Sequence, residues 1–116
     1  MSIVIDPQLT REILDFRSAR DWEQFHTLRT LSNSLVIEAA ELAELTQWTP
    51  DAELEQRASE VRARLEEEVS DLLILMTYLV HDQGIDVATA IRNKLQSNDR
   101  KYPVEKFRGT SRKYNE

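Results

Sequence analysis

Residues 28–45, LRTLSNSLVIEAAELAEL, carry the pattern that decides the fold. Leucines recur there at spacings of three and four residues, which is typical of one apolar face of an α-helix. They are Leu28, Leu31, Leu35, Leu42 and Leu45. The position that completes this rhythm is Glu38, and Glu41 lies one turn further on. A helix therefore places two carboxylates side by side where a leucine is expected.

The same pattern recurs between residues 61 and 79. Its apolar members are Val61, Leu65, Leu72, Leu75 and Leu79. Here Glu68 stands at the missing position, and Asp71 follows three residues later. Because a buried charge is costly unless it is compensated, two facing carboxylate pairs predict a bound cation.

The composition favours a single all-α domain spanning residues 1–116. The chain has only two glycines and three prolines, so long uninterrupted helices are expected. It has no cysteine, which excludes disulfides, zinc-thiolate sites and cysteine nucleophiles and favours a reducing cytoplasm. The amino terminus does not resemble a secretory signal, and no apolar run approaches the roughly 20 residues of a membrane span.

Capping residues and periodicity predict helices at residues 8–18, 26–47 and 86–101, with a long third element at residues 52–83. In a straight hairpin the two carboxylate pairs would be about 15 Å out of register at 1.5 Å per residue. A shared cation therefore predicts a break near residues 57–59. The third element is apolar on more than one face, which predicts a four-helix bundle packed in an oligomer. Residues 104–116 have no periodicity and are expected to form an irregular tail.

Charge is distributed unevenly along the chain. Residues 1–91 hold 7 arginines and 18 acids, whereas residues 92–116 hold 8 basic and 3 acidic residues. The basic segment could bind a phosphorylated small molecule or nucleic acid, or it could be a solvated surface tail with no binding role. The overall charge of −6 and the lack of a recognition motif disfavour nucleic acid.

Oxygen ligands without thiolates suit a hard cation, Mg²⁺ or alternatively Mn²⁺, and hence chemistry at phosphorus. A di-iron bundle would need a second Glu-x-x-His motif besides Glu23-x-x-His26, and the chain has none. The phosphate-binding candidates are Lys94, Asn98, Lys101 and Tyr102. Lys94, Asn98 and either Lys101 or Tyr102 recur at helical spacing and so share one face. Trp48 is either a core residue or a stacking platform for a base.

Several motifs together resemble a known family. Glu38-x-x-Glu41 is separated by 26 residues from Glu68-x-x-Asp71, and the stretches DWEQFH (21–26), ELAEL leading to QW (41–48), EEVSDLLI (67–74), NDRKYP (98–103) and SRKY (111–114) add to it. Over residues 10–116 this resembles the MazG-like all-α nucleoside triphosphate pyrophosphohydrolases, in their dCTP pyrophosphatase branch.

The resemblance implies Mg²⁺-dependent hydrolysis of a (deoxy)nucleoside triphosphate, dCTP or a related dNTP, to the monophosphate and pyrophosphate. It implies that the four carboxylates are catalytic metal ligands and that the enzyme is a homodimer or homotetramer. By position, Trp22, His26 and Trp48 would line the nucleoside pocket, and the four phosphate-binding candidates Lys94, Asn98, Lys101 and Tyr102 would help at the phosphates. Glu23, Gln24 and Phe25 would also bind the substrate. Leu75 departs from the family pattern, in which relatives carry a tyrosine. The alternative is a non-catalytic helical module that binds a nucleotide or a protein.

Overall fold

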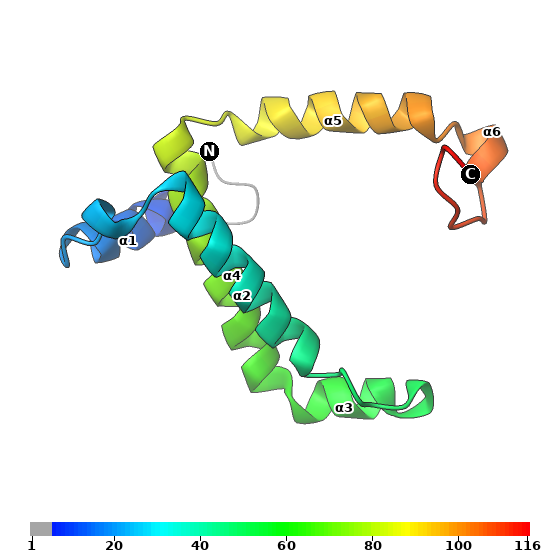
Figure 1. Ribbon diagram of the computed structural model, residues 1–116, viewed down its shortest axis with the longest axis horizontal. Helices are drawn as coiled ribbons and strands as arrows, with labels where there is room; N and C mark the ends of the chain where they lie inside the picture. Colours follow the sequence, from blue (N-terminus) through cyan, green and yellow to red (C-terminus); the bar gives the residue numbers. More distant parts are fainter. Residues whose placement is uncertain (1–5) are drawn as a thin grey trace.

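The computed structural model describes residues 6–116, and throughout them it contains helices and turns without a strand (Figure 1). The all-α prediction is thereby confirmed. The α-helices are α1 (Pro7–Ser18), α2 (Leu28–Glu44), α3 (Leu54–Glu60), α4 (Arg62–Gln83), α5 (Val87–Lys101) and α6 (Val104–Phe107). Two 3₁₀ turns, η1 (Glu23–Phe25) and η2 (Asp51–Glu53), lie in the connections. None of the helices described is long and apolar enough to cross a membrane.

Side-chain caps mark where α1, α2 and α5 begin, and a glycine marks where α4 ends. The Asp6 carboxylate accepts a hydrogen bond from the Leu9 backbone N–H at 2.7 Å, and Asp86 caps α5 in the same way. Thr27 forms a capping box with Thr30, so α2 begins at Leu28 rather than at residue 26. Gly84 ends α4 with a φ of 62°, a left-handed conformation that favours glycine.

Helices α2 and α4 run antiparallel, side by side, and form the centre of the chain (Figure 1). Their facing seams bury Leu31, which is only 2% exposed, together with Leu45, Val61 and Tyr78. Each seam leucine removed from water contributes about 2 kcal/mol. The amphipathic rhythm read from the sequence therefore describes the real contact between these two helices.

The predicted break before the second carboxylate helix is present. It lies at Val61, which has φ −101° and ψ 16° and separates α3 from α4, slightly later than the expected residues 57–59. Helix α3 turns across the lower end of the α2–α4 pair (Figure 1). The Arg57 side chain explains this path, because its Nε donates a hydrogen bond to the Leu45 backbone oxygen at 2.9 Å. That bond satisfies a carbonyl at the end of α2 and ties α3 to it.

A single chain does not by itself form the four-helix bundle, which was predicted for an oligomer. Helix α5 extends away from the other helices (Figure 1), and it makes no extensive contact with α1, α2 or α4. The radius of gyration is 17.7 Å, against about 13 Å for a compact chain of this length. Leu95 on α5 is 61% exposed. Because an apolar helix face needs a partner, this arrangement favours the predicted packing against another subunit.

The expected irregular tail is also only partly correct. Residues 104–107 form α6, after which the chain folds back so that Tyr114 meets Tyr102 edge-on with ring centroids 5.9 Å apart. Phe107 packs on Tyr102 in the same geometry at 4.9 Å. These aromatic contacts hold the tail against the end of α5, and helical periodicity does not reveal them.

Candidate functional site

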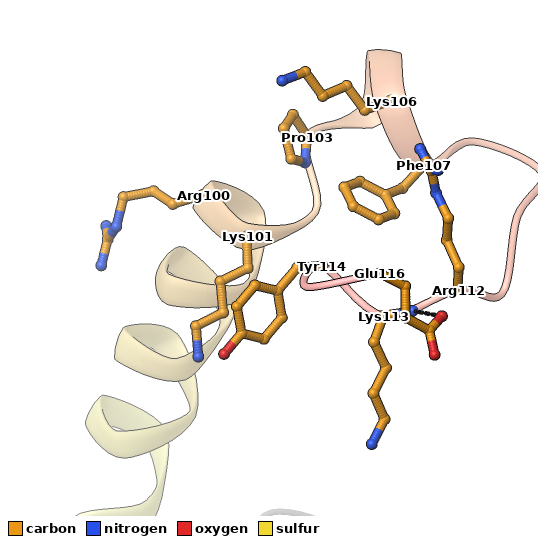
Figure 2. Close-up of a pocket in the computed structure, with 9 residues that line it drawn as sticks. All are labelled: Arg100, Lys101, Pro103, Lys106, Phe107, Arg112, Lys113, Tyr114 and Glu116. Atoms are coloured by element: carbon orange, nitrogen blue, oxygen red, sulfur yellow. Dashed lines mark hydrogen bonds between the residues drawn. The ribbon is translucent and has the colours of Figure 1, made fainter.

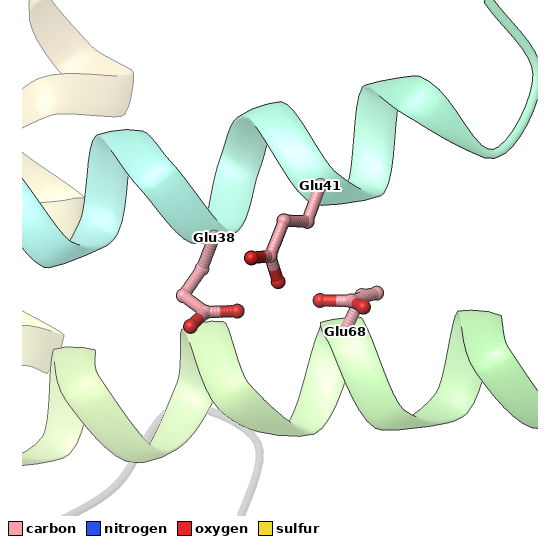
Figure 3. A group of neighbouring side chains, drawn as sticks. All are labelled: Glu38, Glu41 and Glu68. Carbon is pink, nitrogen blue, oxygen red and sulfur yellow. The ribbon is translucent and has the colours of Figure 1, made fainter.

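A cluster of three carboxylates lies midway along the α2–α4 pair (Figure 3). Glu38 and Glu41 extend from α2 and Glu68 from the facing turn of α4, with one oxygen of each lying within 4.8 Å of the others. The i, i+3 spacing on α2 places the first two on one face, and the break at Val61 brings the third into register. The structure thus brings together three of the four predicted ligands.

Two oxygens of this cluster are buried without a hydrogen-bond donor. Among the residues described, Glu38 Oε2 and Glu68 Oε2 have no partner. Burial, then the adjoining Glu41, raises the pKa of Glu38 from 4.5 to about 7, with further contributions from Asp71 and Glu68. Burial and the charge of Glu41 likewise raise the pKa of Glu68. Buried acceptors without donors are rare in proteins, so this geometry suits a cation.

Asp71, the fourth predicted ligand, lies beside the cluster rather than in it. It is exposed, and its oxygens are outside the group of three. Its negative charge nevertheless contributes to the raised pKa values of Glu38 and Glu68. Asp71 therefore belongs to the same acidic surroundings without joining the group of three.

The predicted nucleoside residues 22–26 lie at the other end of α2, in the connection from α1. Trp22 packs edge-on against Phe16 with ring centroids 5.9 Å apart. Glu23 accepts a hydrogen bond from the Ser18 hydroxyl at 3.1 Å, and Gln24 donates to Asp21 at 3.0 Å. These bonds occupy the two polar side chains locally. Phe25 is 64% exposed, although it is large and apolar.

His26 belongs to a polar network that sequence reasoning missed. Buried Arg17 donates two hydrogen bonds to Asp82, at 2.7 and 2.8 Å, and its Nη1 lies 3.3 Å from His26 Nδ1. The guanidinium also stacks on Tyr78, 4.5 Å from the ring centroid. A signal for it exists in the sequence, since Asp82 continues the rhythm of Leu75 and Leu79 on α4.

Trp48 is 86% exposed and lies just beyond the carboxyl end of α2. The 17 residues of α2, roughly 25 Å of helix, separate it from His26. A hollow of about 390 Å³ adjoins it, lined by Glu44, Leu45, Trp48, Thr49, Pro50, Glu53, Gln56, Arg57 and Glu60. Within one chain the aromatic residues predicted for one nucleoside pocket therefore lie at opposite ends of α2.

The predicted phosphate-binding residues lie on α5 and so away from the carboxylates. Lys94 and Asn98 are on the helix, while Lys101 and Tyr102 adjoin the folded tail. A second hollow, of about 240 Å³, is lined there mostly by basic and aromatic side chains (Figure 2). The Lys101 ammonium group lies 5.0 Å from the centroid of Tyr114. One chain does not bring these side chains to the carboxylates.

Comparison with known proteins agrees with the motifs. Residues 34–116 match the MazG-like family. The chain belongs to the MazG-like family. The predicted family is therefore confirmed, and the matched residues include Glu38 and Glu41 of α2 and all of α4.

Individual relatives of this MazG-like chain carry related names. It is 43% identical over 104 residues to human dCTP pyrophosphatase 1, covering 88% of this chain and 61% of that protein. It is 45% identical over 102 residues to the Bos taurus dCTP pyrophosphatase 1, covering 86% and 60%. The chain thus spans about 60% of the length of these curated relatives, and the similarity supports the predicted branch.

A solved structure is also similar. A pyrophosphatase from Archaeoglobus fulgidus superposes on the MazG-like chain with a TM-score of 0.79 at 35% identity. The match covers 83% of this chain and 90% of that one. The extended, all-α arrangement is therefore shared with a protein whose fold is known.

Proposed function

We propose that this MazG-like chain is a nucleoside triphosphate pyrophosphatase that hydrolyses dCTP and related dNTPs to the monophosphate and pyrophosphate. The observation that carries the proposal is the carboxylate cluster, with two buried oxygens that lack donors. The names of the similar proteins, dCTP pyrophosphatase and pyrophosphatase, supply the reaction.

Mg²⁺ is the cation that we infer for the cluster, with Mn²⁺ as the alternative. The donor set is all oxygen, and the two orphaned carboxylate oxygens fit a hard divalent ion. Glu38, Glu41, Glu68 and Asp71 would hold it. Such an ion, when bound, neutralises triphosphate charge and makes a nearby water more acidic.

The chain's own groups then have separate tasks in the reaction. A glutamate oxygen of the cluster would orient the attacking water and accept its proton. The water oxygen bonds to the α-phosphorus, and the bond from that phosphorus to the oxygen bridging α and β breaks. Pyrophosphate leaves with the electrons of that bond, so the products are the monophosphate and pyrophosphate.

Substrate contacts come from three separate parts of the chain in this proposal. Trp22, Phe25, His26 and Trp48 would contact the nucleoside, and Lys94, Asn98, Lys101 and Tyr102 the phosphates. Because α5 lies away from the carboxylates of its own chain, we infer a homodimer or homotetramer in which subunits share these groups. The exposed apolar face of α5 supports that inference. We further propose that residues 1–116 form one domain acting in the cytoplasm.

The decisive experiment is to incubate the purified protein with each dNTP and Mg²⁺ and to measure pyrophosphate and monophosphate. We expect release from dCTP in particular, and its loss in Glu38→Gln, which keeps the shape of the side chain but removes its charge. Glu67→Gln is the matched control, since Glu67 is an exposed glutamate of α4 outside the cluster. Absence of pyrophosphate with every triphosphate would leave the alternative of a non-catalytic binding module.

A further inference from the structure

The network at the junction of α1 and α4 contains a fixed donor that faces a histidine. Arg17 is 3% exposed, and both terminal nitrogens of its guanidinium bond to Asp82. The bidentate pair and the stacking on Tyr78 hold the guanidinium in one orientation. Nη1 is thereby placed 3.3 Å from Nδ1 of His26.

This contact determines which nitrogen of His26 carries the proton. A guanidinium has only donors and stays protonated in proteins, so Nδ1 must be the acceptor. A neutral imidazole with its lone pair at Nδ1 has its hydrogen at Nε2. Among the residues described, Nε2 has no hydrogen-bond partner, and it is not one of the side-chain atoms buried without a partner. In half-buried His26, this nitrogen therefore keeps some accessible surface for a ligand.

We propose that Arg17 is a positioning residue that holds His26 in its Nε2–H form, so that His26 presents a hydrogen-bond donor to an acceptor atom of the nucleotide. The inference rests on the proposed function, in which His26 contacts the nucleoside. It adds that the contacting atom must be an oxygen, or a ring nitrogen with a lone pair, and that Asp82 orients Arg17 through their paired hydrogen bonds.

The charges around His26 agree with a neutral ring. Burial, followed by the positive charge of Arg17, lowers the pKa of His26, while Asp82 on α4 and Glu23 in η1 oppose that change. Tyr78, the remaining neighbour on α4, packs on the imidazole with centroids 5.3 Å apart and is itself neutral, because burial raises its pKa. A lowered pKa keeps the imidazole uncharged at neutral pH.

The first test uses the unmodified full chain without nucleotide. Histidine labelled with ¹⁵N in the imidazole reports by NMR which ring nitrogen bears hydrogen, and Asp82→Asn and His26→Gln variants assign the two histidine signals. We expect hydrogen at Nε2 of His26 and titration below about pH 6.5, the ordinary histidine value. Hydrogen at Nδ1 would overturn the inference.

The second test separates positioning from simple structural support. Arg17→Met removes the donors, whereas Asp82→Asn loosens the tether but leaves Arg17 facing Nδ1. We expect Arg17→Met to shift His26 toward the Nδ1–H form and to raise KM for dCTP roughly 3- to 10-fold, the usual effect of one lost hydrogen bond, with little change in kcat. Asp82→Asn should keep the Nε2–H form. If the two variants raise KM equally without altering the tautomer, Arg17 is only a structural residue.

Substitution of His26 itself gives a third measurement that does not depend on Arg17. The Gln amide nitrogen reaches the position of Nε2 and the Asn amide reaches only that of Nδ1, so His26→Gln should keep KM closer to the parent value than His26→Asn. Equal losses would contradict a donor at Nε2. If no dNTP releases pyrophosphate while hydrogen is at Nε2, the proposed function fails instead. If dCTP is hydrolysed and Arg17→Met changes neither tautomer nor KM, the inference fails.

Discussion

Substitution of Glu38 by glutamine should change stability in opposite directions with and without a divalent ion. Burial and the neighbouring carboxylates raise the pKa of Glu38 from 4.5 to about 7. An acid with a raised pKa binds protons more tightly in the folded state, so the free energy of unfolding falls as pH rises from about 4.5 to about 7. Glutamine cannot ionise and removes this cost.

The size of the effect follows from that change. The rise in the Glu38 pKa corresponds to a loss of roughly 3 kcal/mol in the free energy of unfolding if the carboxyl is fully shielded from solvent. Solvent screening reduces this loss to about 1 kcal/mol. In EDTA at pH 8, Glu38→Gln should therefore raise Tm by about 4 °C. In millimolar Mg²⁺ the order should reverse, because the parent gains binding energy that the variant lacks.

Thermal unfolding followed by circular dichroism at fixed protein concentration measures Tm in EDTA and in Mg²⁺. The Glu67→Gln variant is the control for the loss of one negative charge from the surface of α4 and should respond to Mg²⁺ like the parent. A Glu38→Gln protein that is less stable than the parent in EDTA at pH 8 would refute the reasoning. In that case the carboxylate is well solvated or otherwise compensated in the fold.

Three further predictions address the elements around the cluster. Arg57→Met removes the bond to the Leu45 carbonyl and should reduce the free energy of unfolding in urea by about 1 kcal/mol; an unchanged midpoint would mean that α3 is held in another way. Trp48 is 86% exposed, so dCTP should quench its fluorescence if a base stacks there, and Trp48→Ala should raise KM about 10-fold. Leu95→Glu should lower the mass measured by light scattering, because a charge on the apolar face of α5 opposes subunit packing. Gln96→Glu is the control. An unchanged mass in Leu95→Glu would exclude that face from the interface.

The helices and their pairing were predictable because they depend on local signals. Capping by Asp6 and Asp86 and the αL stop at Gly84 act within a few residues, so they can be read from the sequence. The break between α3 and α4 was predictable from register together with a cation shared by the two carboxylate pairs. The predicted position, residues 57–59, precedes the actual break at Val61 by two residues. Val61 is buried, and its burial depends on packing that the sequence does not show.

The position of α5 was not predictable. Its periodicity indicates which face needs cover, but not whether the cover comes from the same chain. For the same reason Lys94 and Asn98 could be assigned to one face of a helix and not to a place near the carboxylates. The aromatic packing of Tyr102 with Phe107 and Tyr114 depends on how the chain folds back after α6, which helical periodicity does not reveal.

The same sequence signal, an acid on an apolar seam, has two different outcomes on α4. Glu68 and Asp82 both continue the rhythm of Leu72, Leu75 and Leu79. Asp82 is compensated within the chain by Arg17, whose hydrogen bonds lower the pKa of that carboxyl. Glu68 lies beside Glu38 and Glu41, and its pKa is raised. The sequence reveals that an acid is out of place, but the compensating residue is 65 positions away. A seam acid that lacks an internal partner is therefore the one that needs a ligand, and this distinguishes the candidate metal site from the structural ion pair.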